Sequence, residues 1–89
     1  MKAIVTVVGK DRIGIIASVC TLLANYQVNI LDISQTVMQG YFTMMMAVDT
    51  SKSEIPFVEL AKKLEVKGEE MGMSIRLQRE DIFDAMHRV

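Results

Sequence analysis

The sequence predicts an α+β domain with a ferredoxin-like βαββαβ sandwich, in which two helices cover one face of a four-stranded antiparallel sheet. Three observations carry this prediction. Four apolar runs have the composition or alternation of strands, and two helical patterns separate the first from the second and the third from the fourth. A two-residue turn separates the second and third runs. Right-handed crossovers then give the strand order 4-1-3-2, and a short C-terminal helix is expected to follow.

The first half of the chain is predicted to form a central strand, a helix and an edge strand. Residues Lys2–Val8 are apolar on both alternating sets, as expected in the middle of a sheet. Apolar residues then recur at three- and four-residue steps over Ile15–Tyr26, which predicts an amphipathic helix. In Val28–Met38 one alternating set is partly polar, so this strand is expected to lie at the edge, facing water or a partner.

A methionine run marks the third strand, Tyr41–Asp49, which follows a hairpin turn at Gln39-Gly40. Side chains alternate between the faces of a strand, so Met44 and Met46 are predicted to fill the core and Met45 to lie on the other face. The face that the helices leave open then keeps apolar residues of the first and third strands. An open apolar surface of this kind usually marks an interface.

The second half of the chain is predicted to add a helix, a strand and a tail helix. The helix is expected to begin near Glu54 after a serine cap, with Pro56 in its first turn, and to stop at Gly72. Residues 73–78 alternate strictly between apolar and polar, which indicates a half-exposed strand. A last short helix is predicted over Ile82–His87.

The composition indicates one small domain, residues 1–89, with surplus apolar surface. Hydrophobic residues make up 51% of the 89-residue chain, which favours an oligomer because so small a domain buries a limited fraction of its surface. The net charge is −1, and this argues against nucleic acid as a partner, since such binding needs a basic surface. No secretory signal and no apolar stretch of membrane-spanning length is visible. We therefore expect a cytoplasmic protein without a membrane partner.

The reactive side chains form no recognisable catalytic or metal-binding constellation. Cys20 is the only cysteine, and it lies within the apolar pattern of the first helix. His87 is the only histidine and lies near the tail, where a solvated position is expected. No nucleophile–base pair and no cluster with metal-ligand spacing is present in the sequence. We therefore expect no catalytic residue, no metal and no cofactor.

The turn between the first strand and the first helix is the candidate binding site. A strand that turns through glycine into a helix leaves unpaired backbone N–H groups, and these favour an anion such as a carboxylate or phosphate. Arg12 can add a forked, charge-assisted donor. The alternative is a plain connection in which Asp11 caps the helix and Gly9 and Gly14 serve only the tight turn.

Two stretches resemble the ACT domain, the small amino-acid-sensing module of metabolic regulation. They are Val7-Val8-Gly9-Lys10-Asp11-Arg12-Ile13-Gly14-Ile15 and, one helix later, Val28-Asn29-Ile30-Leu31-Asp32-Ile33-Ser34-Gln35. The family has an Asp/Asn-Arg-x-Gly turn after its first strand and Asn-Ile at the head of its second. The resemblance covers essentially the whole chain, and it is closest to small stand-alone ACT proteins related to the ACT half of the glycine-cleavage system repressor.

The resemblance implies a ligand that lies between two subunits. It implies that the turn of one subunit supplies backbone N–H groups and that an asparagine of the neighbour contacts the ligand. The residues that the resemblance implies are Ile13, Gly14 and Ile15 for the N–H groups and Asn29 for the asparagine. The chemistry of the turn adds Gly9, Asp11 and Arg12 to the expected ligand-binding residues. Serine-binding members carry an imidazole and an amide where this chain has Gly9 and Asp11, which argues against serine itself. Many members also have proline where this chain has Ile13.

These features favour a regulatory module that binds a small molecule, expected to be an amino acid, and acts as a homodimer or higher homo-oligomer. The first alternative is an assembly module or accessory subunit without a ligand. An acylphosphatase-like enzyme is disfavoured because Tyr41–Asp49 contains no asparagine and the turn is too short. An RNA-recognition module is disfavoured because the first strand contains no aromatic residue.

Overall fold

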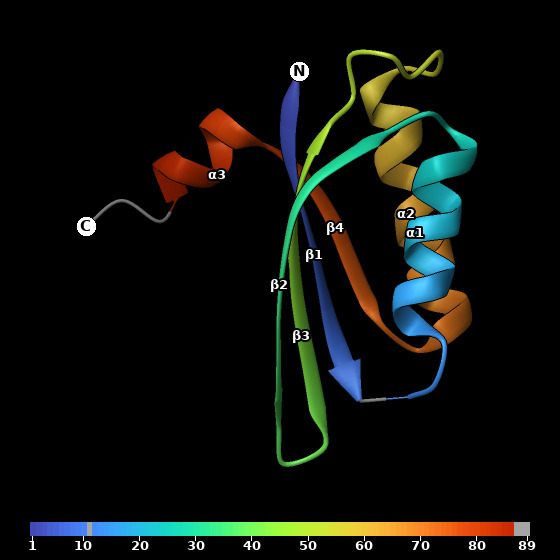
Figure 1. Ribbon diagram of the computed structural model, residues 1–89, viewed down its shortest axis with the longest axis vertical. Coiled ribbons are helices and arrows are strands. Elements are labelled where there is room, and N and C mark those ends of the chain that lie inside the picture. Colours follow the sequence, from blue (N-terminus) through green and yellow to red (C-terminus); the bar gives the residue numbers. More distant parts are fainter. Residues whose placement is uncertain (11, 87–89) are drawn as a thin grey trace.

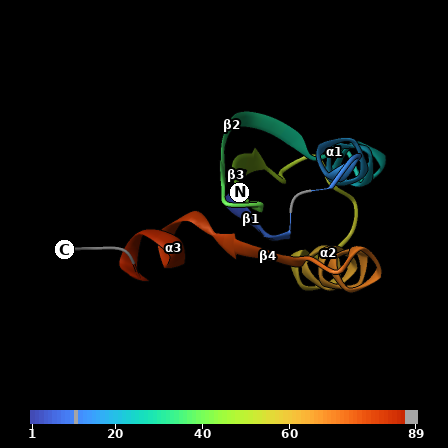
Figure 2. The same cartoon turned by 90° about the horizontal axis from the view of Figure 1, so that it is seen from below.

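The computed structural model describes residues 1–10 and 12–86, and it has the predicted ferredoxin-like fold. Its elements in chain order are β1 (Lys2–Lys10), α1 (Ile15–Asn25), β2 (Asn29–Met38), β3 (Tyr41–Asp49), α2 (Phe57–Met71), β4 (Ser74–Arg79) and α3 (Glu80–Met86). The strands form one sheet in the order β2-β3-β1-β4, and all neighbours are antiparallel. Helices α1 and α2 lie side by side on one face of the sheet (Figures 1 and 2).

The hydrophobic core lies between the sheet and these two helices, because one alternating set of each inner strand faces them. Met44 and Met46 are fully buried while Met45 is exposed, which confirms the predicted division of the methionine run. Apolar residues of both helices close the core from the other side. The buried residues are Ala3, Val5, Val7, Ile15, Val19, Leu23, Val28, Phe42, Met44, Met46, Val48, Leu60, Leu64, Met73, Ile75 and Leu77.

Strand β2 is an exposed edge, as predicted. Every residue from 31 to 38 is exposed, and the register with β3 shifts at Leu31, which is an extra residue on β2. Ile33 and Val37 lie opposite buried residues of β3 and so face the helix side, yet they remain 41% and 55% exposed. The β2–β3 hairpin extends past the ends of both helices, which leaves its tip uncovered (Figure 1).

Helix α2 begins later than the sequence predicted. Pro56 is the N-cap with ψ of 149°, an extended value, so the first helical residue is Phe57 rather than a residue near Glu54. No side chain caps this end, and the Leu60 N–H donates to the Pro56 carbonyl at 3.1 Å. Proline fixes its own φ but leaves its ψ free, so Pro56 can take either a helical or an extended conformation. Here it is extended and is the last residue before the helix. The predicted stop is confirmed, since Gly72 follows the helix with a φ of +69°.

Helix α3 projects from the face of the sheet opposite α1 and α2 (Figures 1 and 2). It begins at Glu80, two residues earlier than predicted, directly after β4. Asp81 accepts hydrogen bonds from the Arg79 guanidinium at 2.8 Å and from the Ile82 N–H at 2.9 Å, which fixes the bend between strand and helix. The predicted end of this helix at His87 lies outside the described residues.

Candidate functional site: the hollow at the β1–α1 turn

Gly14 sets the conformation of the turn that starts α1. Its φ of +88° is in the left-handed region, where glycine is favoured, and it occupies the N-cap position. Its carbonyl accepts the first helical hydrogen bond, from the Ser18 N–H at 2.9 Å. The N–H groups of the three residues between them therefore have no acceptor within the helix. The alternative that Asp11 is the N-cap is wrong, because Gly14 holds that place, and Asp11 itself lies outside the described residues.

A hollow of about 250 Å³ opens beside this turn. Its lining combines the first turn of α1 with the arginine before it and one aromatic ring of β3; the lining residues are Arg12, Gly14, Ile15, Ile16, Ala17 and Phe42. The first turn of α1 carries no acidic side chain, so nothing there neutralises the positive end of the helix dipole. Ile16 and Phe42 add apolar surface. This lining suits a small molecule with an anionic group and a short apolar part.

Arg12 is held in place by the far end of α2. Its Nη1 donates to the carbonyl oxygen of Met71 at 2.6 Å. That carbonyl belongs to the last turn of α2, where the helix dipole favours a cation. The contact uses one of the five guanidinium donors, and the side chain remains exposed. Arg12 therefore ties the turn to α2 and still carries donors for an anion.

Two other residues of the predicted site do not line the hollow. A Cβ at Gly9 would overlap the sulfur of Met73 and lie 2.9 Å from its Cε, so Gly9 leaves room for the side chain of Met73, the residue before β4. Ile13 is fully exposed and points into solvent. The structure thus brings Arg12, Gly14 and Ile15 together at the hollow and assigns Gly9 to packing.

Asn29 lies at the opposite end of the sheet from the turn. It pairs with Asp49, which itself pairs with Lys2 at the start of β1, whereas the turn follows the end of β1. Asn29 lines a second hollow of about 370 Å³ whose other lining residues are Gln27, Val28, Asp49, Ser51 and Lys52. One chain therefore cannot bring Asn29 to the turn.

Asp49 makes this second hollow electrostatically distinctive. Hydrogen bonds from Ser51 hold the pKa of the Asp49 carboxyl below its ordinary value, and the Ser51 N–H donates to it at 2.9 Å. The group is therefore a carboxylate at neutral pH. Sequence reasoning missed Asp49 and Lys52 because no motif marks them, and the β2–β3 register brings Asp49 beside Asn29. Phe42, which is buried in the core, also lines the first hollow, and no sequence signal marked it for the site.

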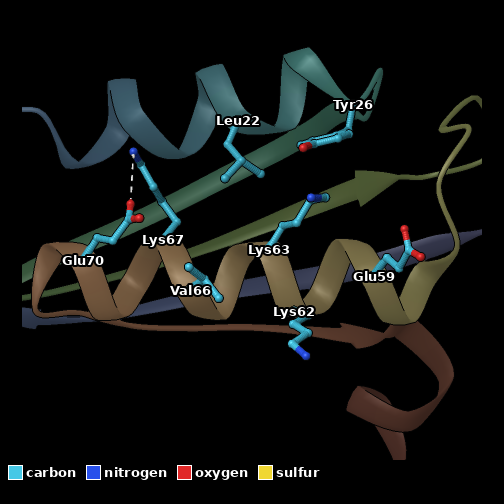
Figure 3. Close-up of a pocket in the computed structure, with 8 residues that line it drawn as sticks. All are labelled: Leu22, Tyr26, Glu59, Lys62, Lys63, Val66, Lys67 and Glu70. Carbon is cyan, nitrogen blue, oxygen red and sulfur yellow. Dashed lines mark ion pairs between the residues drawn. The ribbon is translucent and has the colours of Figure 1, made fainter.

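A larger groove of about 420 Å³ runs between the outer sides of α1 and α2 (Figure 3). The Lys63 ammonium lies 5.4 Å from the centre of the Tyr26 ring, and Lys67 pairs with Glu70 at 3.9 Å. Lys62 points away from α1 (Figure 3). The groove is formed by the sides of helices, whose backbone groups are already paired, and two of its three lysines contact local partners. It therefore offers fewer free groups to a ligand than the hollow at the turn.

Two further features concern membranes and metals. Within the described ranges, no helix is long and apolar enough to cross a membrane. The same residues contain no group of three or more histidine, cysteine, aspartate or glutamate side chains placed to hold a metal ion.

Comparison with known proteins matches the chain to the family model for the ACT domain over residues 2–78. A UPF0237 protein of Clostridium acetobutylicum is 54% identical over 89 residues, which is 100% of both chains. The structure of an ACT domain protein from Streptococcus pneumoniae is 45% identical, with a TM-score of 0.82 and 98% of each chain covered. The structure described as a putative glycine cleavage system transcriptional repressor is 22% identical, with a TM-score of 0.72 over 86% of this chain and 44% of that one. The last match shows a shared fold.

Proposed function

The chain belongs to the ACT-domain family, whose members are regulatory ligand-binding modules, and from this premise we propose that it is a regulatory homodimer that binds a small amino acid at the β1–α1 turn. One observation carries the proposal. The first turn of α1 presents backbone N–H groups without helical acceptors to a hollow that also contains the Arg12 side chain. These donors match a carboxylate. The described lining contains no side-chain nucleophile or general base, so the hollow is suited to binding rather than to catalysis.

The dimer in this proposal forms through β2. An exposed edge strand presents unpaired backbone groups, and proteins usually cover such edges. Two β2 strands related by a two-fold axis would pair antiparallel and build one continuous sheet across both subunits. The same pairing would cover Ile33, Val37 and Ile16, which face the helix side of this edge and are 41%, 55% and 38% exposed.

Antiparallel pairing supplies the asparagine that one chain alone cannot bring to the turn. The start of β2 in one subunit would lie beside the end of β2 in the other. The backbone of the partner subunit's Asn29 would then lie near Val37, which pairs with Phe42 at the first hollow. A zwitterion fits this arrangement, with its carboxylate at the turn and its ammonium group near an amide oxygen at the start of the partner subunit's β2.

Calorimetric titration with a panel of amino acids tests this proposal. A ligand of about ten non-hydrogen atoms rarely binds better than micromolar, so we expect a dissociation constant between tens of micromolar and roughly millimolar. Asn29→Ala should weaken binding at least several-fold. Asn25→Ala is the matched control, since Asn25 is also exposed but ends α1. Equal binding by wild type and Asn29→Ala would refute the intersubunit site.

A second candidate function is an assembly module without a ligand. The exposed β2 edge favours it, because pairing through this edge requires no small molecule. If no amino acid binds at several millimolar while the protein is dimeric, the assembly function replaces the binding function.

A further inference from the structure

We propose that the open face of the sheet, together with α3, is a second interface on which another copy of this chain packs face to face and turned end for end. Dimers formed through β2 would thereby join into tetramers. This inference concerns a surface on the other side of the sheet from the hollow at the turn. The face-to-face contact does not depend on a bound ligand, and only the count of four chains rests on the β2 dimer of the proposed function.

The open face has an apolar centre and a charged margin. The register places Ile4 beside Ala47, Thr6 beside Met45 and Val8 beside Thr43 in the middle of the sheet. Val8 and Met45 are 42% and 37% exposed. Charged side chains surround this centre; they are Lys2, Lys10, Asp32, Asp49 and Arg76. An apolar centre with a polar rim is typical of protein–protein interfaces.

The size of this surface is adequate for a stable contact. Three strands of nine or ten residues are about 30 Å long at ~3.3 Å per residue, and the six residues of β4 extend about 20 Å, with ~4.8 Å between strands. The flat footprint is then about 500 Å², and side-chain relief and α3 add to it. Stable interfaces bury about 800 Å² per partner, so the open face with α3 approaches the required area.

Helix α3 projects from one corner of the open face. It packs on β1 and β4 and stands out from the sheet beside the β4 edge, at the end where β1 begins (Figures 1 and 2). Seven helical residues are about 10 Å long, which matches the distance between stacked sheets. A helix of this length is marginally stable unless it packs against other residues. Ile82 on α3 is nevertheless 46% exposed, so part of its apolar surface has no contact within the chain. A sheet stacked on the open face would lie against α3 and cover Ile82.

Charge selects the orientation of the second copy. Helix α3 is acidic, with Glu80, Asp81 and Asp84. Turning the second copy end for end places the α3 of one copy beside the end of β1 in the other, where Lys10 is exposed. A two-fold axis along the strands would instead place α3 beside the start of β2, close to Asp32 and to Asp49, which pairs with the N-terminal ammonium group at 3.4 Å. Asp32 would repel α3 there, whereas Lys10 attracts it in the other arrangement, so the end-for-end arrangement is favoured.

Sedimentation velocity of the full chain over a concentration series tests the second interface. We expect wild type to reach the mass of four chains, and Met45→Glu to stop at two because it buries a charge in the apolar centre. Ile82→Glu should also weaken the tetramer, and it cannot disturb the core because α3 lies outside it. Val58→Glu is the control. Val58 is 77% exposed on α2, away from both surfaces, so this variant should behave as wild type.

A charge exchange tests the orientation. Lys10→Glu and Asp84→Lys should each weaken the tetramer, whereas the double variant should restore it. Tetramers unaffected by both Met45→Glu and Ile82→Glu would overturn the proposal, as would a wild-type protein of two chains whose dimer persists in Met45→Glu. A two-chain wild-type species that Met45→Glu dissociates would instead overturn the β2 dimer of the proposed function. Failure of the double variant to restore the tetramer would overturn the end-for-end orientation. A β2 variant such as Val37→Glu tests the first interface. Its loss of β2 pairing would not count for or against the face-to-face contact.

Discussion

Arg12 Nη1 lies 2.6 Å from the carbonyl oxygen of Met71, so the turn that begins α1 is fastened to the last turn of α2. The two residues are 59 positions apart in the sequence. This contact holds the guanidinium beside the hollow that we propose as the ligand site. It also makes the stability of the turn depend on a residue that we propose as a ligand contact.

Replacing Arg12 should therefore lower both stability and affinity. Arg12→Ala removes one hydrogen bond from a charged donor to an exposed carbonyl, so the free energy of unfolding should fall by about 1 kcal/mol. Urea denaturation measures this change, with Lys62→Ala as the control because Lys62 points away from α1 (Figure 3). Equal stability of Arg12→Ala and wild type would show that the contact contributes nothing in solution.

A side chain at Gly9 should displace the end of the Met73 side chain. Gly9→Ala would push the new methyl group against the flexible thioether of Met73, which can shift, so the free energy of unfolding should fall by about 1 kcal/mol, the low end of overpacking costs. Met73→Ala removes the obstructing atoms, so the double variant should lose less stability than the two single losses combined. Additive losses in this double-mutant cycle would contradict the predicted clash.

Gly14 should matter for both the fold and the site. Gly14→Ala places a Cβ at a φ of +88°, which costs about 1 kcal/mol or more, although nothing lies within 4 Å of the added atom. If the turn relaxes, its N–H groups move and amino-acid affinity should fall with stability. Thermal melting and calorimetry on the same samples measure both effects. Unchanged affinity in Gly14→Ala would argue against the turn as the binding element.

Asp49 should contribute stability that is lost in acid. Its pKa is lowered in the folded state by Ser51, so its contribution is present above the ordinary carboxyl pKa of about 4 and disappears as pH falls through the folded value. Asp49→Asn should therefore melt at a lower temperature than wild type at neutral pH. The difference should shrink below about pH 4. A difference that stays constant from pH 7 to pH 3 would rule out the ionised carboxylate as its cause.

The sequence was sufficient to predict the elements whose patterns are local. The alternation of Met44, Met45 and Met46 and the stop at Gly72 depend on the period of a strand and on one backbone conformation, and both were predicted correctly. The start of α2 was missed because Pro56 fits either the cap or the first turn, and only its ψ decides. The contact of Arg12 with Met71 depends on tertiary packing, which no local pattern reports. Asn29 and the turn were matched only through resemblance, since the chain separates them.

The most direct test of the ligand site is an NMR titration of isotope-labelled protein with the amino acid that binds in the calorimetric panel. The account predicts shifts in the backbone amides of Ile15, Ile16 and Ala17 and in the Asn29 signals, all following one binding curve. Residues of the α1–α2 groove, such as Val66, should not shift. Shifts centred on that groove, with the amides at the start of α1 unmoved, would contradict the proposed site.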